Sequence, residues 1–247
     1  IPQLQFEVLR SIGHDNPSSL ENRLSGVQLI PGAGEFVYAD EAVFSDDGEG
    51  SSTALNVHGA DAVPDLEASL DQLTAAAPNL SSVALVVGWF GDDLRANRIA
   101  IRPCVETANK TTYPENWSVN GIARAEARAV SQVGGKPAYG GTPSDASVVA
   151  AIAALKARGL SVLFNPFLFM DVAEANALTD PYTGADSQPV YPWRGRITCD
   201  PAPGVAGSPD RTAAAASQIE NFLGGATADD FTVSGTSVTW NGGDDWG

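Results

Sequence analysis

Four carboxylates stand directly after segments that the sequence predicts to be β-strands, namely Asp92, Asp93, Glu106 and Asp171. Two carboxyl groups that face each other across a glycosidic bond can cleave it, at separations of ~5–5.5 Å or ~6.5–9.5 Å according to mechanism. In a barrel of parallel strands, such groups project from the carboxyl ends of the strands. The chemistry that these residues could perform is therefore glycoside hydrolysis, with Glu106 and Asp171 as candidate catalytic residues.

Three of these carboxylates also have a structural interpretation. Asp92 and Asp93 can form a turn with Gly91, and Asp171 can cap the segment that follows its strand. A carboxylate used in this way holds the backbone in place and does not act on a substrate. The sequence leaves both interpretations open.

Aromatic side chains are predicted at the same edge of the fold. Trp89, Phe90, Tyr139 and Trp193 could form a platform against which a sugar ring stacks, or they could be core and interface residues. The candidate glycan-facing residues are Trp89, Asp92, Asp93, Tyr139 and Trp193.

A long loop rich in proline and glycine is expected between residues 171 and 207, and loops of this length are usually functional or form interfaces. Arg194 and Arg196 lie within it. Their guanidinium groups could pair with the strand-end carboxylates and hold the loop in one conformation, which would be a structural role.

The elements that must position these residues follow from hydrophobic spacing. Apolar residues from Leu66 to Ala77 recur at helical intervals, between Pro64 at the start and Pro78 at the stop. Residues 82–90 are almost continuously apolar, which is typical of a strand covered on both faces in a parallel sheet.

A strand–helix–strand unit is predicted next. Residues 136–139 form the first strand, Thr142 is the helix N-cap, Pro143 opens the helix, and Gly159 closes it. The apolar stripe of this helix is Val148, Ile152 and Leu155, and residues 160–170 form the next strand. Such a unit requires a right-handed crossover and a parallel sheet.

A second helix is predicted with Ser208 as its cap and Pro209 as its first residue. Ala216, Ile219 and Leu223 would line one face of it. Residues 231–240 then predict a small hairpin.

These elements amount to about three βα units, whereas a closed (β/α)₈ barrel needs eight units and ~250 residues. We therefore expect an α/β fold with an incomplete, TIM-barrel-like domain and an open sheet edge. Residues 1–8 alternate like a strand that starts abruptly, so we also expect the chain to be cut from something longer.

Composition excludes several classes of function. The formal charge of −16 and the pI near 4.3 disfavour binding to nucleic acid or to anionic membranes. Cys104 and Cys199 are too few for a disulfide framework and are expected as free thiols. His14 and His58 stand alone in polar loops, so no metal site or cofactor is predicted.

Several strings resemble the tail-tip, or megatron, proteins of siphophages and gene transfer agents. Residues 1–8 resemble the end of the N-terminal hub region of that family, and residues 85–95 are similar to the first strand of its TIM-barrel-like domain. Further similar strings, in the same order, are residues 139–146, 180–184 and 191–199.

This resemblance implies that residues 1–60 are the β-rich end of the hub region. Residues 61–247 would be the first part of a TIM-barrel-like domain, similar in fold to glycoside hydrolases. It also implies a location at the tail tip or baseplate of a virion assembled in the host cytoplasm. The implied partners are hub and distal tail proteins in a homotrimer, with host envelope glycan as a further contact.

Two functions from different classes follow. The first is a structural component of the tail tip that contacts the host envelope during adsorption and DNA delivery. The second is a glycoside hydrolase that acts on envelope polysaccharide or peptidoglycan glycan. Because fold similarity alone supports the enzymatic function, the structural one is favoured, and the key acid of a hydrolase would be expected beyond Gly247.

Overall fold

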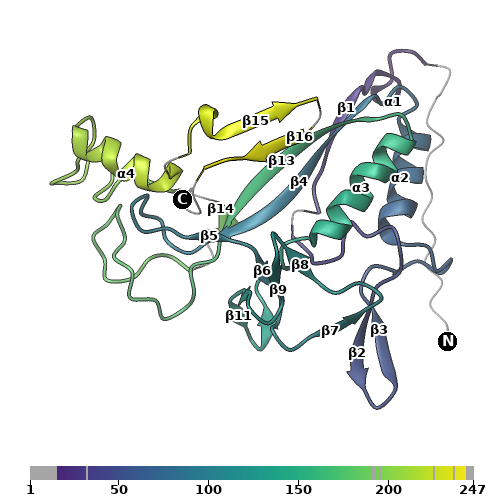
Figure 1. Ribbon diagram of the computed structural model, residues 1–247, viewed down its shortest axis with the longest axis horizontal. Helices are drawn as coiled ribbons and strands as arrows, with labels where there is room; N and C mark the ends of the chain where they lie inside the picture. The colour runs from purple at the N-terminus through teal and green to yellow at the C-terminus, as the bar shows by residue number, and fades with distance from the viewer. Residues whose placement is uncertain are drawn as a thin grey trace. The chain divides into compact units, whose positions relative to one another are not determined.

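The computed structural model describes residues 16–31, 33–190, 193–194, 196–224, 226–235 and 237–242, with only the backbone of residues 193–194. The strand predicted at residues 1–8 and His14 lie outside these ranges. The described chain is a mixed α/β fold with many strands and few helices (Figure 1). No closed barrel is present among the described residues, and the TIM-barrel-like character of the domain stays a prediction.

The chain divides into two compact units that alternate along the sequence. Unit 1 comprises Ile1–Val87, Asn109–Glu126 and Pro143–Pro166, and unit 2 comprises Gly88–Ala108, Ala127–Thr142 and Phe167–Gly247. The predicted domain boundary, between a hub region at residues 1–60 and a TIM-barrel-like domain at residues 61–247, stays a prediction.

The largest sheet in the described part of the chain has five strands. Its order is β1 (Gly26–Leu29), β4 (Ser82–Gly91), β13 (Ser161–Met170) and β14 (Trp193–Arg194), with β5 (Ile101–Arg102) also paired to β4. β1 and β4 are parallel. At the start of β13 the amide of Ser161 donates to the carbonyl of Ser81, and after its end the amide of Asp171 donates to that of Gly91. β4 and β13 therefore run in the same direction.

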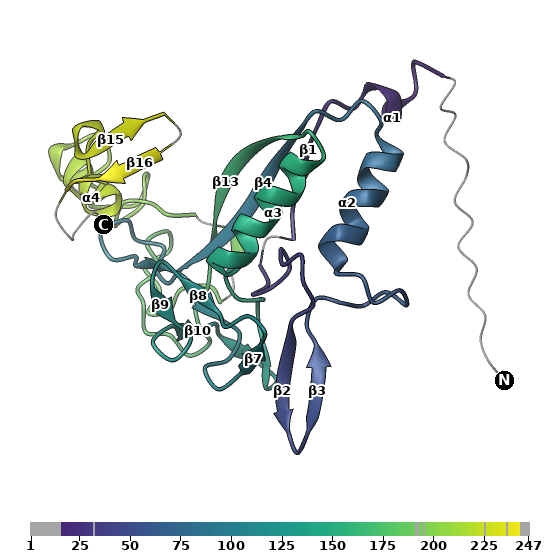
Figure 2. The same cartoon turned by 45° about the vertical axis from the view of Figure 1, so that its right-hand side comes forward.

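Unit 1 contains the helices that pack beside each other, α2 (Asp65–Ala76) and α3 (Asp145–Ala157) (Figure 2). α2 is the helix predicted after Pro64, and it buries Leu66 and Leu70. Arg158, just after α3, joins the two helices, because its Nη2 lies 2.7 Å from Glu67 and 2.6 Å from Asp71. A short helix, α1 (Leu20–Arg23), precedes β1.

The remaining strands of unit 1 form small antiparallel sheets. β2 (Phe44–Gly48) lies between β3 (Ser51–Ala54) and β7 (Thr111–Tyr113), and β8 (Ser118–Val119) pairs with β9 (Ile122–Ala123). The ring of Phe44 stacks on that of Tyr113 at 5.5 Å between centroids. This stacked cross-strand pair stabilises the contact between β2 and β7.

A buried ion pair stabilises the inside of unit 1. Arg124 donates through both terminal nitrogens to the carboxylate of Glu35, at 2.8 and 2.7 Å, and Lys110 Nζ lies 3.3 Å from the same group. The Arg124 guanidinium also lies over the ring of Trp117 at 6.0 Å from its centroid. We call these four residues the Glu35 cluster.

Unit 2 is built from short strands around an aromatic core. β6 (Cys104–Val105) pairs in parallel with β10 (Arg128–Ala129), and β11 (Gln132–Val133) pairs antiparallel with β12 (Lys136–Pro137). The core rings belong to Phe90, Tyr139, Phe167 and Phe169, with neighbouring centroids 4.9–5.8 Å apart. The unit ends with α4 (Ala213–Leu223), a 3₁₀ turn (Ala228–Asp230) and the hairpin of β15 (Phe231–Ser234) and β16 (Ser237–Trp240), which confirms the predicted hairpin.

The predicted strand–helix–strand unit was wrong in its first strand. Residues 136–137 form β12, which belongs to a two-stranded hairpin, whereas the sheet neighbour of β13 is β4. The N-cap of α3 is Ser144, whose Oγ accepts from the amide of Ser147 at 3.1 Å. Thr142 cannot cap the helix because its backbone amide and its Oγ are both bonded to the backbone of Cys104. Gly159, at φ +75°, ends the helix as predicted.

The buried faces of two helices also differ from the prediction. α3 buries Ser147, Ala151 and Leu155, one residue away from the predicted stripe at its first two positions, so small side chains form the buried face. α4 begins after Thr212, whose side chain accepts from the amide of Ala214, and not after Ser208. Ser208 is instead held by the carbonyl of Pro201. α4 buries no residue among those described.

Candidate functional site

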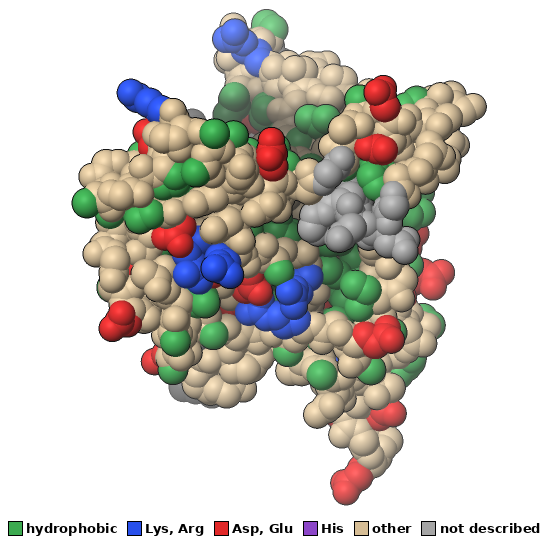
Figure 3. Space-filling view, turned by 60° about the vertical axis from the view of Figure 1, so that its left-hand side comes forward, with side chains coloured by type: hydrophobic (Ala, Val, Ile, Leu, Met, Phe, Trp, Pro, Cys, Tyr) green, Lys and Arg blue, Asp and Glu red, His purple; other side chains and the backbone are tan. Residues whose placement is uncertain are grey.

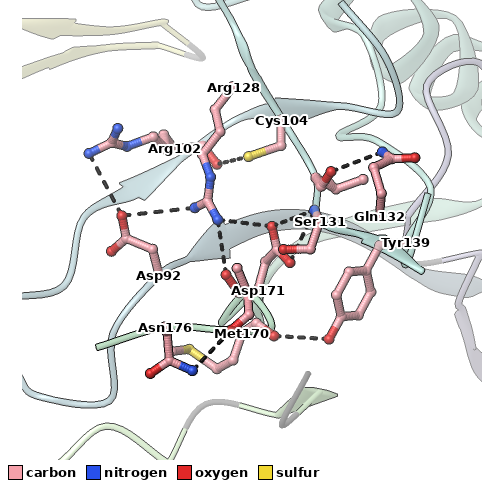
Figure 4. Close-up of polar contacts among 12 residues, drawn as sticks. Asp92, Arg102, Cys104, Arg128, Ser131, Gln132, Tyr139, Met170, Asp171 and Asn176 are labelled. Carbon is pink, nitrogen blue, oxygen red and sulfur yellow. Dashed lines mark hydrogen bonds and ion pairs between the residues drawn. The ribbon is translucent and has the colours of Figure 1, made fainter. Parts of the chain in front are cut away.

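Asp92 and Asp171 come from the ends of neighbouring strands, β4 and β13, and a single arginine lies between them (Figure 4). Arg128, on β10, places Nη2 at 3.0 Å from Oδ2 of Asp171 and Nη1 at 3.8 Å from Oδ2 of Asp92. The register pair of Arg128 with Cys104 holds this arginine in position. We call the three charged residues the Arg128 cluster.

Asp171 is the most enclosed member of the cluster, with a side-chain exposure of 0%. Its carboxylate accepts from Arg128 Nη2 and from the amide of Ser131, and its backbone carbonyl also accepts from Arg128 at 3.0 Å. A buried carboxylate needs such partners, because an unpaired charge away from water is costly. Asp171 therefore fastens the loop around Ser131 to the end of β13.

Asp92 is the more accessible carboxylate, with 31% of its side chain exposed. Its Oδ1 accepts from the amide of Ala100 at 2.9 Å, which closes the turn after β4. Its Oδ2 lies 4.0 Å from Arg102 and 3.8 Å from Arg128. Arg128 Nη1 is buried and makes no hydrogen bond.

Asp93 has a different set of partners although it is the next residue. Its carboxylate accepts from Arg95 Nη2 at 2.6 Å and from Gln188 Nε2 at 2.7 Å. Burial alone would raise the pKa of Asp93, but the hydrogen bonds from Arg95 and Gln188 outweigh it and lower the pKa below its ordinary value. Asp93 thus ties the turn after β4 to the loop that carries Gln188.

A pocket of about 380 Å³ lies within unit 2 over these carboxylates. The space-filling view in Figure 3 shows basic and acidic side chains gathered side by side in a hollow of the surface. The polar residues that line the pocket are Asp92, Asp93, Arg98, Arg128, Asp171 and Asn176. Such a pocket offers paired charges and an amide to a polar ligand.

The predicted glycan-facing aromatics are not among the residues that line this pocket. The Tyr139 hydroxyl donates to the carbonyl of Met170 at 2.9 Å, and its ring packs against Phe90 and Phe169 in the core. Trp89 is half-buried in β4. The Trp193 side chain lies outside the described residues.

Glu106 stands apart from the other strand-end carboxylates. It is half-buried and follows β6, which pairs with β10 and is not a strand of the five-stranded sheet. The strand predicted before it is interrupted at Pro103, a residue that has no backbone amide to donate. Glu106 is not among the lining residues of the pocket.

Among the described side chains, the arginines that hold the strand-end carboxylates are Arg95 and Arg128. The side chain of Arg194 lies outside the described residues, and Arg196 lies over the ring of Tyr182, 5.3 Å from its centroid. The proximity of Arg95 to Asp93 in sequence could have indicated the first pair, but no local signal joins Arg128 to a carboxylate 43 residues away.

Cys104 and Cys199 are both free, as expected. Burial raises the pKa of the Cys104 thiol to about 11, so this thiol is inert at neutral pH. Within the described residues, no group of three or more metal-ligating side chains could hold an ion. In the same part of the chain, no helix combines the length and apolar character needed to cross a bilayer.

No protein-family model matches this chain, and no curated protein matches its sequence.

Proposed function

We propose that the chain is a structural module of the tail tip of a tailed phage or gene transfer agent, where it helps to build the baseplate and meets the host envelope. The ordered strings between residues 1 and 199 support this proposal. So does the use of charged residues in the candidate site, which hold loops and strand ends together.

The observation that favours a structural role over catalysis is the burial of Asp171. A general acid or nucleophile must reach the substrate, and the proton donor of a glycosidase must also exchange its proton. Asp171 is wholly enclosed, and both its carboxylate and its carbonyl are engaged by Arg128. Asp93 is similarly engaged by Arg95 and Gln188. These contacts give both carboxylates a structural role.

For the fold we propose an unfinished TIM-barrel-like domain. The parallel pairing of β1 with β4 and the common direction of β4 and β13 support it. The exposure of two successive residues on β13, Leu163 at 67% and Phe164 at 50%, supports it as well. Successive strand residues point to opposite faces, so this part of β13 is uncovered on both faces, as expected where further barrel units would pack.

The proposed partners are hub and distal tail proteins, with a homotrimer as the assembled form. An antibody raised against the purified chain should label the tail tips of particles produced by the encoding organism, as seen by negative-stain microscopy. Label on the capsid, or none on intact particles, would contradict the proposal. Pre-immune serum is the control.

A glycoside hydrolase remains the second candidate, because Asp92 and Asp171 come from neighbouring strands and border one pocket, with Asp92 31% exposed although Asp171 is enclosed. Reducing-sugar release from host envelope glycan should be compared for particles that carry the native chain, Asp92→Asn or Glu106→Gln. Under the structural proposal, none of these particles releases sugar beyond a tail-less control, and both variants assemble. Sugar release that either substitution abolishes in assembled particles would establish the enzymatic function.

A further inference from the structure

The hairpin of β15 and β16 has two chemically opposite faces. Phe231 lies directly opposite Trp240 and Val233 opposite Val238, so alternation along both strands puts these four apolar residues on one face. The other face carries only hydroxyl side chains, Thr232, Ser234, Ser237 and Thr239. We call the first set the apolar hairpin face.

This apolar hairpin face is open to solvent at its outer end. Val233 is 68% exposed and Val238 is 64% exposed, while the rings of Phe231 and Trp240 contact each other at 5.0 Å between centroids. In the described part of the chain the hairpin is a sheet of only two strands. An isolated two-stranded hairpin is marginally stable in water, and a further element on its apolar face is what stabilises it.

The charge of the surrounding chain indicates what kind of surface covers this face. Between Thr212 and Gly242 the described chain has no lysine or arginine, whereas Glu220, Asp229 and Asp230 are acidic. At this face, a second copy of the same segment would bring its own acidic residues against these. A surface with an apolar centre and a basic rim matches both the valines and the acids.

We propose that the apolar hairpin face is a docking site for a partner polypeptide that presents apolar side chains flanked by lysine or arginine. The partner contacts Val233 and Val238 through its apolar residues, and its cations face the acidic residues directly before β15, Asp229 and Asp230. The site is independent of the Arg128 cluster and of the tail-tip assignment, since it rests on the register, exposure and charge of this segment alone.

The test uses the whole 247-residue chain and a labelled synthetic peptide that alternates valine and lysine, with binding followed by fluorescence anisotropy. A peptide that alternates valine and glutamate is the charge control. The variant V233T/V238T keeps the size and β-branching of both residues but removes their apolar character. The matched variant T239S alters the hydroxyl face and leaves the apolar face unchanged.

The native chain and T239S should bind the valine–lysine peptide equally, and V233T/V238T should bind it about tenfold more weakly. Affinity should also fall with added salt, because the charged rim is screened. Equal affinity for both peptides, equal affinity of both variants, or no binding overturns the proposal. Two further outcomes also overturn it. One is self-association of the native chain that V233T/V238T abolishes, and the other is binding to zwitterionic lipid vesicles that the same variant abolishes.

Discussion

The Glu35 cluster of unit 1 and the Arg128 cluster of unit 2 both pair a buried carboxylate with an arginine, yet they differ in closure. In the Glu35 cluster the exposure of the two partners is 2% and 10%, and the guanidinium meets the carboxylate through two parallel hydrogen bonds. In the Arg128 cluster one arginine is divided between two carboxylates, and one of its nitrogens lacks a hydrogen bond. The first pair satisfies both partners, whereas in the second the buried Nη1 of Arg128 has no hydrogen bond, although the residue lines a pocket.

This difference separates a buried charge that only stabilises the fold from one that can also bind a ligand. A bidentate pair satisfies both partners and leaves nothing for a ligand. An arginine shared between two carboxylates keeps a positive group beside the pocket, but it binds each carboxylate less strongly. The following predictions, from the largest expected effect to the smallest, test that contrast.

Glu35→Gln should cause the largest loss of stability. The substitution leaves Arg124 charged and enclosed without its counter-ion, and breaking a buried pair in this way typically costs about 3–5 kcal/mol. The free energy of unfolding in urea measures it. Glu41→Gln, at an exposed position, is the control and should change stability little. A loss of stability as small as that of the control would mean that Arg124 does not depend on Glu35 as its buried counter-ion.

Asp171→Asn should destabilise the chain less, by about 1–3 kcal/mol. Arg128 keeps Asp92 at 3.8 Å and is itself 26% exposed, so water and the second acid compensate part of the lost charge. The same urea titration measures the effect, with the exposed Asp186→Asn as control. A loss equal to that of Glu35→Gln would remove the proposed distinction between the clusters.

Asp93→Asn should destabilise the chain by about 1–2 kcal/mol at neutral pH, and this cost should depend on pH. The folded-state pKa of Asp93 is lowered, so its contribution is complete above the unfolded value near 3.8. It is lost as the pH falls through the still lower folded value. Thermal unfolding of both proteins between neutral pH and about pH 2 should show the difference shrinking below about pH 4. A difference that is constant over this range would contradict the prediction.

Asp92→Asn should change stability least, by about 0.5 kcal/mol, because its contacts with Arg102 and Arg128 are long and partly solvated. The asparagine oxygen can still accept from the amide of Ala100. Differential scanning calorimetry against the native chain measures it. A loss above about 2 kcal/mol would place Asp92 in the same class as Asp171.

How far the sequence could predict this molecule depended on whether the signal was local. α2 and β4 follow from apolar spacing within one segment, and both lie where predicted. The N-cap of α3 was placed two residues early, because the hydrogen bonds that engage Thr142 come from Cys104, 38 residues earlier. The partner strand of β13 was also misassigned, since β4 and β13 are separated by an excursion of about 70 residues that contains strands of its own.

The candidate site shows the same limit. Asp92 and Asp171 were recognisable as strand-end acids, because a run of apolar residues that predicts a strand precedes each of them in sequence. Arg128 and Gln188 were not recognisable, since each reaches its carboxylate from a segment with no periodic signal. The sequence thus predicts Asp92 and Asp171 at the sheet edge, but it wrongly adds Glu106 and does not predict which cations hold the acids.

The alkylation rate of Cys104 can measure how often the structure around the Arg128 cluster opens. Its thiol is paired in register with Arg128, is wholly enclosed, and has a pKa of about 11. Only about one such thiol in a thousand is ionised near pH 8, so alkylation must wait for the layer around it to open. The half-buried Cys199 is a second thiol in the same unit, and its alkylation rate serves as an internal reference. The ratio of the two alkylation rates therefore reports how often the structure around Cys104 opens locally, and no cysteine has to be introduced.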